Sequence, residues 1–261
     1  MNIPFEKYHG TGNDFIIIDI RHHAIPDDPE MIGLLCDRHY GIGADGLIML
    51  SASAGNDFRM RYFNADGREA SLCGNGGRCI AAFAHKHGII KEEAHFTAAD
   101  GDHSAYVLAK KGNTYTVSLE MQDVKIAHWK DGHIFLDTGS PHLVKECEGL
   151  STLDVFTEGK KLRHAPTFAP EGTNVNFVEE AEGVLNIRTY ERGVEDETLS
   201  CGTGVTATAI ARAIRDDLGS PVHVKAIGGT LKVSFIRTDT HFTSIKLEGP
   251  AEFVFKGEVE I

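Results

Sequence analysis

The sequence predicts an α/β (mixed α+β) protein of two pseudo-symmetric domains, with its active site in the cleft between them. Three observations predict this organisation. The chain of 261 residues is long enough for two domains of ordinary size. A Cys-Gly-x-Gly stretch occurs at Cys73 and again at Cys201, and each copy leads into an Ala-rich run typical of a helix. The predicted strands surround both copies in the same order, and a cleft between similar domains commonly holds a small molecule.

The first half is predicted to contain strands on both sides of one long helix. That helix follows the first cysteine copy to about His87 and is stopped by Gly88. A shorter helix begins with Asp28 as its N-cap and is expected to end at Gly41. Alternating or β-branched apolar runs predict the strands, which are 15–20, 47–50, 58–63 and a meander over 95–120.

The second half repeats this order. The predicted elements are strands at 135–137, 172–178 and 186–190, a helix at 151–163, the helix after Cys201, and hairpin strands from 222 to 255. At an offset of 128 residues Tyr62 matches Tyr190, Asn64 matches Arg192, and Glu69 matches Glu197. We interpret this register as an internal duplication whose period is too long for a solenoid.

Composition restricts the partners. The formal net charge of −12 argues against nucleic acid and anionic membrane, and it favours solubility. Residues 1–7 lack the pattern of a secretory signal, and no apolar run reaches the roughly 18 residues needed to cross a bilayer. Five thinly spread cysteines favour a reducing, cytoplasmic location.

The Cys-Gly-x-Gly stretch has a specific chemistry at a helix start. The first backbone N–H groups of a helix are unpaired, the helix dipole is positive there, and glycines allow a carboxylate or phosphate to approach. A thiol in this place is biased towards thiolate. Two such starts would hold one anionic group with a sulfur on either side. This arrangement suits removing a proton from one face of a carbon and returning one to the other.

The same residues also fit simpler structural roles. Cys73 and Cys201 alone fit small buried residues beside glycine turns, but two copies in register favour a site. Cys79 is expected in the core, and Cys36 and Cys147 in the core or at neutral surface positions. The histidines and cysteines lack metal-ligand spacing, so no metal is expected.

A G-x-G-x-x-G match at residues 41–46 is rejected as a dinucleotide fingerprint. It follows a predicted helix and opens a predicted strand, which reverses the required context. We expect a tight helix-to-strand connection there.

Five polar residues lie at predicted strand ends or turns: Asn13, Asn64, Asn174, Glu191 and Arg192. Each alone fits a turn residue or a solvated charge. Together, at repeat-related places, they are candidates to hold a second carboxylate and an amine, the arginine by a bidentate pair.

The motifs resemble those of the diaminopimelate epimerase family, in order over essentially the whole chain. They are Gly10–Phe15, Gly41–Gly46, Cys73–Cys79, Gly172–Val175, Glu191–Gly193 and Cys201–Gly204. The resemblance implies an isomerase without pyridoxal phosphate, metal or other cofactor. It would interconvert LL- and meso-2,6-diaminoheptanedioate on the route to lysine and peptidoglycan, as a cytoplasmic homodimer. It also implies domains at 1–121, with the final strand 252–261, and at 122–251, each a mostly antiparallel curved sheet around a central helix.

The resemblance also implies roles for individual residues. Cys73 and Cys201 would be the catalytic acid–base pair. Backbone N–H groups of Gly74, Asn75, Gly202 and Thr203 would hold the reacting α-carboxylate. The five polar residues named above would hold the remainder of the substrate.

Two departures from the family concern the far end of the substrate. Ser140, before Pro141 and His142, stands where the family usually has asparagine, so one distal contact is weaker or water-mediated. Ser140 and His142 are thus further candidate site residues. Glu195 and Asp196 stand where a glycine and little added charge are expected, which would change the loop.

Three rival functions remain open on the sequence. The first is a related racemase for proline or hydroxyproline, which would need no site for a distal carboxylate. The second is a non-catalytic protein that binds a carboxylate at paired helix ends. The third is a thiol redox switch, and we expect a Cys73–Cys201 disulfide to be an oxidised, inactive form.

Overall fold

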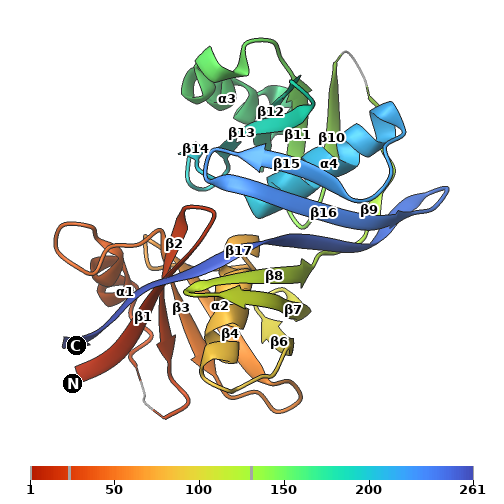
Figure 1. Cartoon of the computed structure of the whole chain (residues 1–261). Coiled ribbons are helices and arrows are strands. Elements are labelled where there is room, and N and C mark those ends of the chain that lie inside the picture. The colour runs from red at the N-terminus through yellow and green to blue at the C-terminus, as the bar shows by residue number, and fades with distance from the viewer. Residues whose placement is uncertain (1, 23–24, 130–131, 261) are drawn as a thin grey trace. The chain divides into compact units, whose positions relative to one another are not determined.

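The computed structural model describes residues 2–22, 25–129 and 132–260, and it divides the chain into two compact units (Figure 1). Unit 1 is Met1–Leu119 with Gly249–Ile261, and unit 2 is Glu120–Glu248. The expected boundaries were after residues 121 and 251. The predicted first domain begins at Met1 and its final strand ends at Ile261. Both of these residues lie outside the described residues.

Unit 1 surrounds one helix with strands. Its elements are β1 (Asn2–Gly10), β2 (Asn13–Asp19), α1 (Pro29–Cys36), β3 (Gly46–Ser51), β4 (Phe58–Asn64), β5 (Glu69–Ala70), α2 (Gly74–Lys86), β6 (Glu93–Ala98), β7 (Gly101–Lys111) and β8 (Thr114–Glu120). Neighbouring strands pair antiparallel, except for the parallel pairs β2–β3 and β4–β6. The end of the last strand of the chain completes the ring, because its residue Glu252 pairs with both Thr114 and His9.

Unit 2 repeats the same sequence of pairings. Its elements are β9 (Val124–Lys125), β10 (His133–Asp137), β11 (Pro141–Glu146), α3 (Val155–Arg163), β12 (Asn174–Ala181), β13 (Val184–Glu191), β14 (Asp196–Thr198), α4 (Gly202–Asp216), β15 (Val222–Ala226), β16 (Gly229–Arg237) and β17 (His241–Glu260), with short 3₁₀ turns η1 (Leu150–Thr152) and η2 (Pro166–Phe168). The parallel pairs are now β11–β12 and β13–β15. The prediction of a mixed α+β fold is therefore confirmed.

The two helices that follow the cysteines are the centres of the two units. In α2 every residue from Gly74 to Ala84 is buried, and in α4 the run from Gly204 to Ala213 is buried. A helix buried on all sides must be apolar or small-sided around its whole circumference, which explains the Ala-rich sequences. Small side chains also let the strands approach the helix closely. Within the described residues, no helix has both the length and the apolar character to cross a bilayer.

The first helix is shorter than predicted. Asp28 caps α1 as expected, accepting a hydrogen bond from the Glu30 N–H. The prediction that the helix runs to Gly41 was wrong, because the Asp37 carboxylate accepts from the N–H groups of His39 and Tyr40 and starts a turn. Gly41 lies instead where the chain returns over the helix, since a Cβ there would be 1.9 Å from the Leu34 carbonyl oxygen. Residues 41–46 thus connect a helix to a strand, as expected.

The internal repeat slips by one residue in strand β13. Leu47 pairs with Phe63, whereas Val175, its counterpart at offset 128, pairs with Tyr190. Tyr190 therefore takes the place of Phe63, and the predicted match of Tyr62 with Tyr190 was wrong. A slip of one residue reverses the two faces of a strand, and both aromatic rings, Phe63 and Tyr190, are buried in their cores.

The slip changes the matched polar residues as well. Next to the paired aromatic residue, Asn64 corresponds to Glu191 rather than to Arg192. The following strand agrees, because Phe63 pairs with Glu69 while Tyr190 pairs with Glu197. The two units therefore present chemically different groups at this strand end.

Candidate active site

Each cysteine of the repeated motif is the N-cap of a central helix. Cys73 and Cys201 have extended backbones (φ −89° and −111°), and neither side chain caps its own helix. Their carbonyl oxygens accept the first helical hydrogen bonds, from Gly77 N–H at 2.7 Å and Val205 N–H at 2.9 Å. The preceding N–H groups, of residues 74–76 and 202–204, have no acceptor within the helix. Each helix start thus combines a thiol with donors suited to an anion.

Glycines in the first turn let these helices lie directly on polar and apolar neighbours. A Cβ at Gly204 would be 2.4 Å from Asn176 Oδ1, and one at Gly76 would be 3.2 Å from Ile48 Cδ1. At Gly204 the contact atom belongs to a buried, hydrogen-bonded side chain, so it cannot move away cheaply. The close packing fixes the position of the helix start.

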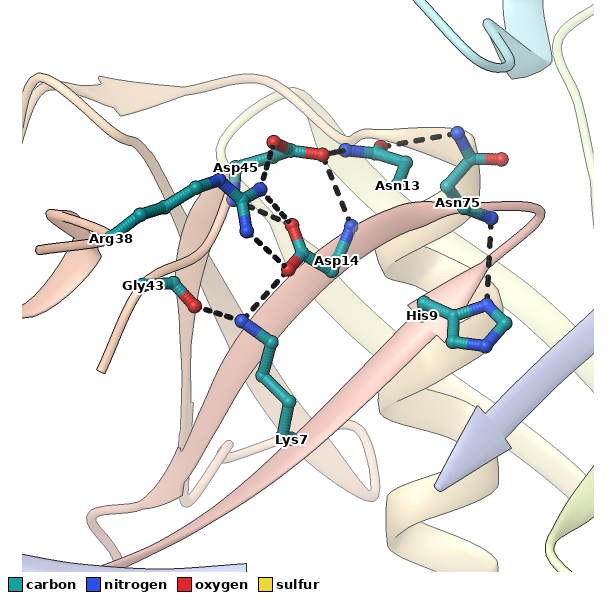
Figure 2. A network of polar contacts seen from close by, with 9 residues as sticks. Lys7, His9, Asn13, Asp14, Arg38, Gly43, Asp45 and Asn75 are labelled. Atoms are coloured by element: carbon teal, nitrogen blue, oxygen red, sulfur yellow. Dashed lines mark hydrogen bonds and ion pairs between the residues drawn. The ribbon is translucent and has the colours of Figure 1, made fainter. Parts of the chain in front are cut away.

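In the half-site of unit 1, Cys73 and Asn75 both contact the side-chain oxygen of Asn13. Figure 2 shows Asn13 between Asn75 and Asp45. The Cys73 thiol donates to Asn13 Oδ1 at 3.5 Å, and Asn75 Nδ2 donates to the same oxygen at 3.1 Å. On its other side, Asn13 Nδ2 donates to Asp45 Oδ2 at 2.8 Å. The loop between β1 and β2 thereby reaches the start of α2.

A buried arginine supports the first turn of α2. Arg78 is fully buried and donates to Asn75 Oδ1 at 2.8 Å and to the Gly74 carbonyl oxygen at 3.1 Å. Burial lowers the pKa of its guanidinium from the usual value. Its hydrogen bonds hold two of the predicted carboxylate-binding residues in place.

Asn64 closes the turn after β4. Its backbone N–H donates to the Arg68 carbonyl oxygen at 3.0 Å, and its carbonyl oxygen accepts from Gly67 N–H at 2.9 Å. It pairs with Gly46, which in turn pairs with Phe15, and its side chain is exposed. Asn64 thus lies at the same sheet edge as Asp45 and the β1–β2 turn.

The half-site of unit 2 connects Cys201 to a buried histidine. Cys201 Sγ lies 3.4 Å from Thr203 Oγ1, and His142 Nε2 lies 2.9 Å from the same hydroxyl. Asn176 Nδ2 donates to His142 Nδ1 at 3.0 Å. Complete burial lowers the pKa of His142 to about 3, so the ring is neutral at neutral pH and its Nε2–H donates to Thr203.

A second polar cluster in unit 2 contains Ser140, Asn174 and Arg192. Asn174 Nδ2 donates to Ser140 Oγ at 2.8 Å, and its Oδ1 accepts from Arg192 N–H at 2.8 Å. The Arg192 guanidinium reaches Ser140 Oγ at 3.4 Å. Next to it, Glu191 Oε2 accepts from the Thr198 hydroxyl at 2.9 Å. The cluster offers a cation and an anion on adjacent residues.

The charged loop after β13 is held to α3. Glu195 has φ +60°, in the left-handed region, at the place where glycine was expected. Its carboxylate accepts from Gly193 N–H at 3.0 Å and from Arg163 Nε at 3.1 Å. Burial opposes its charge, but these donors lower the pKa of Glu195 below its usual value. The added charge therefore has local partners.

The remaining cysteines have other surroundings. Cys79 is fully buried on α2, as predicted, and burial raises its pKa well above the usual value. Burial also raises the pKa of Cys36 to about 12. Cys147 is half-buried and donates to the Val178 carbonyl oxygen at 3.7 Å. In the part of the chain that the structure describes, no three His, Cys, Asp or Glu side chains are grouped to hold a metal ion.

Several supporting residues were missed by the sequence analysis. Asn176 alternates with Asn174 along a strand, so both side chains face the same side, and this spacing was a usable signal. Asp45 lies within the quoted motif Gly41–Gly46, which we interpreted only as a connection from a helix to a strand. Arg78 was part of a quoted motif, but its burial requires the closed ring of strands and is not visible in the sequence.

A family model matches both halves of the chain. The family model described as diaminopimelate epimerase matches residues 5–132 and 134–254. A diaminopimelate epimerase of Flavobacterium psychrophilum is 48% identical over 253 residues, covering 96% of this chain and 97% of the relative. One of Chlorobaculum tepidum is 43% identical, covering 97% and 99% of the two chains.

Solved structures share the fold at much lower identity. A phenazine biosynthesis protein of the PhzF family from Bacillus anthracis has a TM-score of 0.77 at 15% identity, covering 100% of both chains. A hydroxyproline epimerase from Agrobacterium vitis, with bound trans-4-hydroxy-L-proline, has a TM-score of 0.70 at 14% identity, covering 99% of this chain and 92% of that one. At such identities the likeness concerns the fold.

Proposed function

The chain belongs to the diaminopimelate epimerase family, and on that premise we propose that it interconverts LL- and meso-2,6-diaminoheptanedioate with two cysteines. The observation that carries the proposal is the pair of helix starts. Cys73 and Cys201 are both N-caps of buried helices, and neither cysteine side chain caps its own helix. In this proposal both half-sites act on one substrate molecule.

The reaction is a proton transfer at one carbon. A thiolate on one side takes the α-proton, and the thiol on the other side gives its proton to the opposite face. The electron pair of the broken C–H bond is delocalised into the α-carboxylate and then forms the new C–H bond. Each turnover leaves the two sulfurs with exchanged protonation states, and the reverse reaction restores them. Both the proton donor and the proton acceptor are side chains of the chain, and the proposed reaction uses neither pyridoxal phosphate nor a metal.

Backbone donors hold the reacting carboxylate. The N–H groups of Gly74, Asn75, Gly202 and Thr203 lie in the first turns of α2 and α4, where the helix dipole favours an anion. Donors fixed before the reaction stabilise the charge that develops when the proton leaves. Arg78, through its bond to the Gly74 carbonyl oxygen, keeps one of these turns in place.

The distal end of the substrate is bound by polar side chains. Arg192 pairs with the second carboxylate and Glu191 with the distal ammonium group, assisted by Asn13, Asn64 and Asn174. Ser140 supports this pocket by accepting from both Asn174 and Arg192. The shorter serine leaves room for a water between it and the substrate.

The enzyme acts in the cytoplasm as a homodimer, on the route to lysine and peptidoglycan. The thinly spread cysteines support the location. Analytical ultracentrifugation tests the dimer, since a single species of monomer mass would contradict it.

The decisive test is incubation with LL-diaminopimelate in heavy water. We expect deuterium at the α-carbon and accumulation of the meso form, followed by proton NMR and chiral chromatography. The absence of both deuterium exchange and meso product, at every enzyme concentration tested, would refute the proposed function. If exchange persists after either cysteine is replaced, the two-cysteine mechanism is refuted and the proposed function stands.

A further inference from the structure

The Asn13 amide is held on both sides by groups of fixed character. Its Nδ2 donates to the Asp45 carboxylate at 2.8 Å, and its Oδ1 receives Asn75 Nδ2 at 3.1 Å (Figure 2). The same Oδ1 receives the Cys73 thiol at 3.5 Å. The orientation of this amide therefore decides whether an acceptor or a donor faces the sulfur.

The ends of this hydrogen-bond chain allow one orientation. A carboxylate only accepts hydrogen bonds, and a guanidinium only donates them. Arg78 donates to Asn75 Oδ1 at 2.8 Å, so Asn75 must turn its Nδ2 to Asn13. Asp45 accepts at the other end, so Asn13 must turn its Nδ2 to Asp45 and its Oδ1 to Cys73.

Asp45 is itself held firmly although its side chain is partly exposed. Its Oδ1 accepts from Arg38 Nη2 at 2.8 Å, and its backbone N–H donates to Asp14 Oδ1 at 2.9 Å. Asp14 N–H donates back to Asp45 Oδ2 at 3.2 Å. The two aspartates therefore share one arginine and bind each other through their backbones.

Asp14 is the less exposed aspartate of this pair. It binds Arg38 through both carboxylate oxygens, at 2.7 and 3.0 Å, and Lys7 Nζ lies 2.9 Å from Oδ2. Burial opposes its charge, but the hydrogen bonds from Arg38 and Lys7 outweigh it and hold the pKa of Asp14 well below its usual range. Lys7 also donates to the Gly43 carbonyl oxygen, which ties in the loop that carries Asp45.

We propose that Asp45 is a positioning residue of the epimerase, which fixes the Asn13 amide so that its oxygen faces the Cys73 thiol. This inference rests on the proposed function, because it concerns the proton that Cys73 delivers. A carbonyl oxygen at the sulfur stabilises the protonated thiol rather than the thiolate. Asp45 thus keeps Cys73 protonated and aimed until the proton is transferred, without touching the substrate.

The test replaces the acceptor-only group by one that can also donate. In Asp45→Asn, the new amide can present either end, so the Asn13 amide is free to turn and place Nδ2 at the sulfur. We expect kcat to fall roughly tenfold with a smaller change in KM, the loss typical of one misdirected hydrogen bond. Asp45→Glu keeps an acceptor-only group and should restore most of kcat.

A second readout follows the thiol directly. In a Cys201→Ala background, the rate of Cys73 alkylation by iodoacetamide is measured against pH, with peptide mass mapping to isolate that cysteine. A donor at the sulfur favours thiolate, so Asp45→Asn should move the midpoint to lower pH by about one unit. A merely structural role for Asp45 would not move this midpoint.

Asp100→Asn is the charge control. It removes a carboxylate that accepts from the Leu72 N–H at 3.2 Å, next to Cys73, and among the hydrogen bonds of the described residues Asp100 contacts neither Asn13 nor Asp45. Charge alone would shift both variants equally, which would overturn the proposal. We expect the shift in Asp45→Asn only, with thermal unfolding measured for both variants.

The results separate the two proposals. If the wild type shows no α-proton exchange, the function is refuted, and the alkylation profiles still decide whether Asp45 orients Asn13. If the wild type epimerises but Asp45→Asn has unchanged kcat and an unchanged alkylation midpoint, the role of Asp45 is refuted and the function stands.

Discussion

The two thiols proposed as the acid–base pair differ in the groups that surround them. Cys73 contacts an amide oxygen whose direction is set by charged residues, while Cys201 contacts a hydroxyl supported by a neutral imidazole. The repeat therefore reproduced the backbone but not the side chains around the sulfur. An epimerase acting on two mirror-related faces of a carbon does not need equivalent acids, because its substrate and product are not mirror images.

The first prediction concerns these thiols. Replacing either Cys73 or Cys201 with alanine should abolish epimerisation, because each face of the carbon needs its own proton carrier. Cys79→Ala is the control, since this buried thiol lies on the same helix and should keep most activity. Turnover in heavy water measures all three, and full activity in Cys73→Ala would contradict the pairing.

The second prediction separates the proposed substrate from proline-type substrates. Arg192→Ala should raise KM for diaminopimelate and lower kcat/KM roughly a hundredfold, as expected when a carboxylate loses a bidentate charged partner. Arg192→Lys keeps the charge but not the fork, so it should recover only part of the loss. A racemase for proline would need no distal carboxylate site, and nearly unchanged activity in Arg192→Ala would favour that rival.

At the scale of elements, the helix starts depend on close packing. Gly204→Ala should lower the free energy of unfolding by about 1–3 kcal/mol, because its Cβ would overlap with Asn176 Oδ1 in a packed core. Gly219→Ala is the control, since a Cβ there would meet nothing within 4 Å. Urea denaturation compares the two variants. Equal stabilities would show that Asn176 yields without cost.

Local patterns were enough to predict the central helices and most strands. The Asp28 cap, the Ala-rich runs and Gly88 act over a few residues, so they can be recognised without tertiary structure. The end of α1 was missed because the Asp37 carboxylate competes for backbone N–H groups, a contest that apolar periodicity does not register. The slip in β13 was missed because Tyr62 and Tyr190 align in the sequence at the offset of 128. In the structure Tyr190 instead takes the buried pairing position that corresponds to Phe63.

The polar site could be predicted only in part. Sequence motifs singled out Asn13, Cys73 and Asn75, since each lies beside glycines at a repeat-related place. Of their supports, Asp45 lies 32 residues from Asn13 along the chain, whereas Arg78 lies three residues from Asn75 on the same helix. Which amide they orient, and in which direction, follows from three-dimensional contacts alone.

At the scale of the whole molecule, His142 makes stability depend on pH. The unfolded histidine binds a proton below about pH 6.5, whereas the buried ring binds one only near pH 3. The unfolded state therefore gains protons first as pH falls, and between pH 7 and 5 this group should remove about 2 kcal/mol of stability. Below about pH 3 no further loss arises from it.

His142→Gln tests this dependence. The glutamine side chain of the variant can still hydrogen-bond Thr203 and Asn176. Unlike histidine, it does not bind a proton as the pH falls. Urea denaturation at pH 7 and pH 5 should show a smaller loss of stability in the variant than in the wild type. Parallel losses in both proteins would mean that other groups carry the acid sensitivity.

The strand β17 determines the order in which the chain can be completed during synthesis. Its residues up to Glu248 pair within unit 2, while those from Gly249 onward close the ring of strands in unit 1. Unit 2 is one continuous segment and has all its residues before unit 1 does. The N-terminal unit, although translated first, leaves β1 and β8 unpaired on one side until the residues from Gly249 onward emerge. Until then the nascent chain carries exposed strand edges, which the end of β17 covers once it has been made.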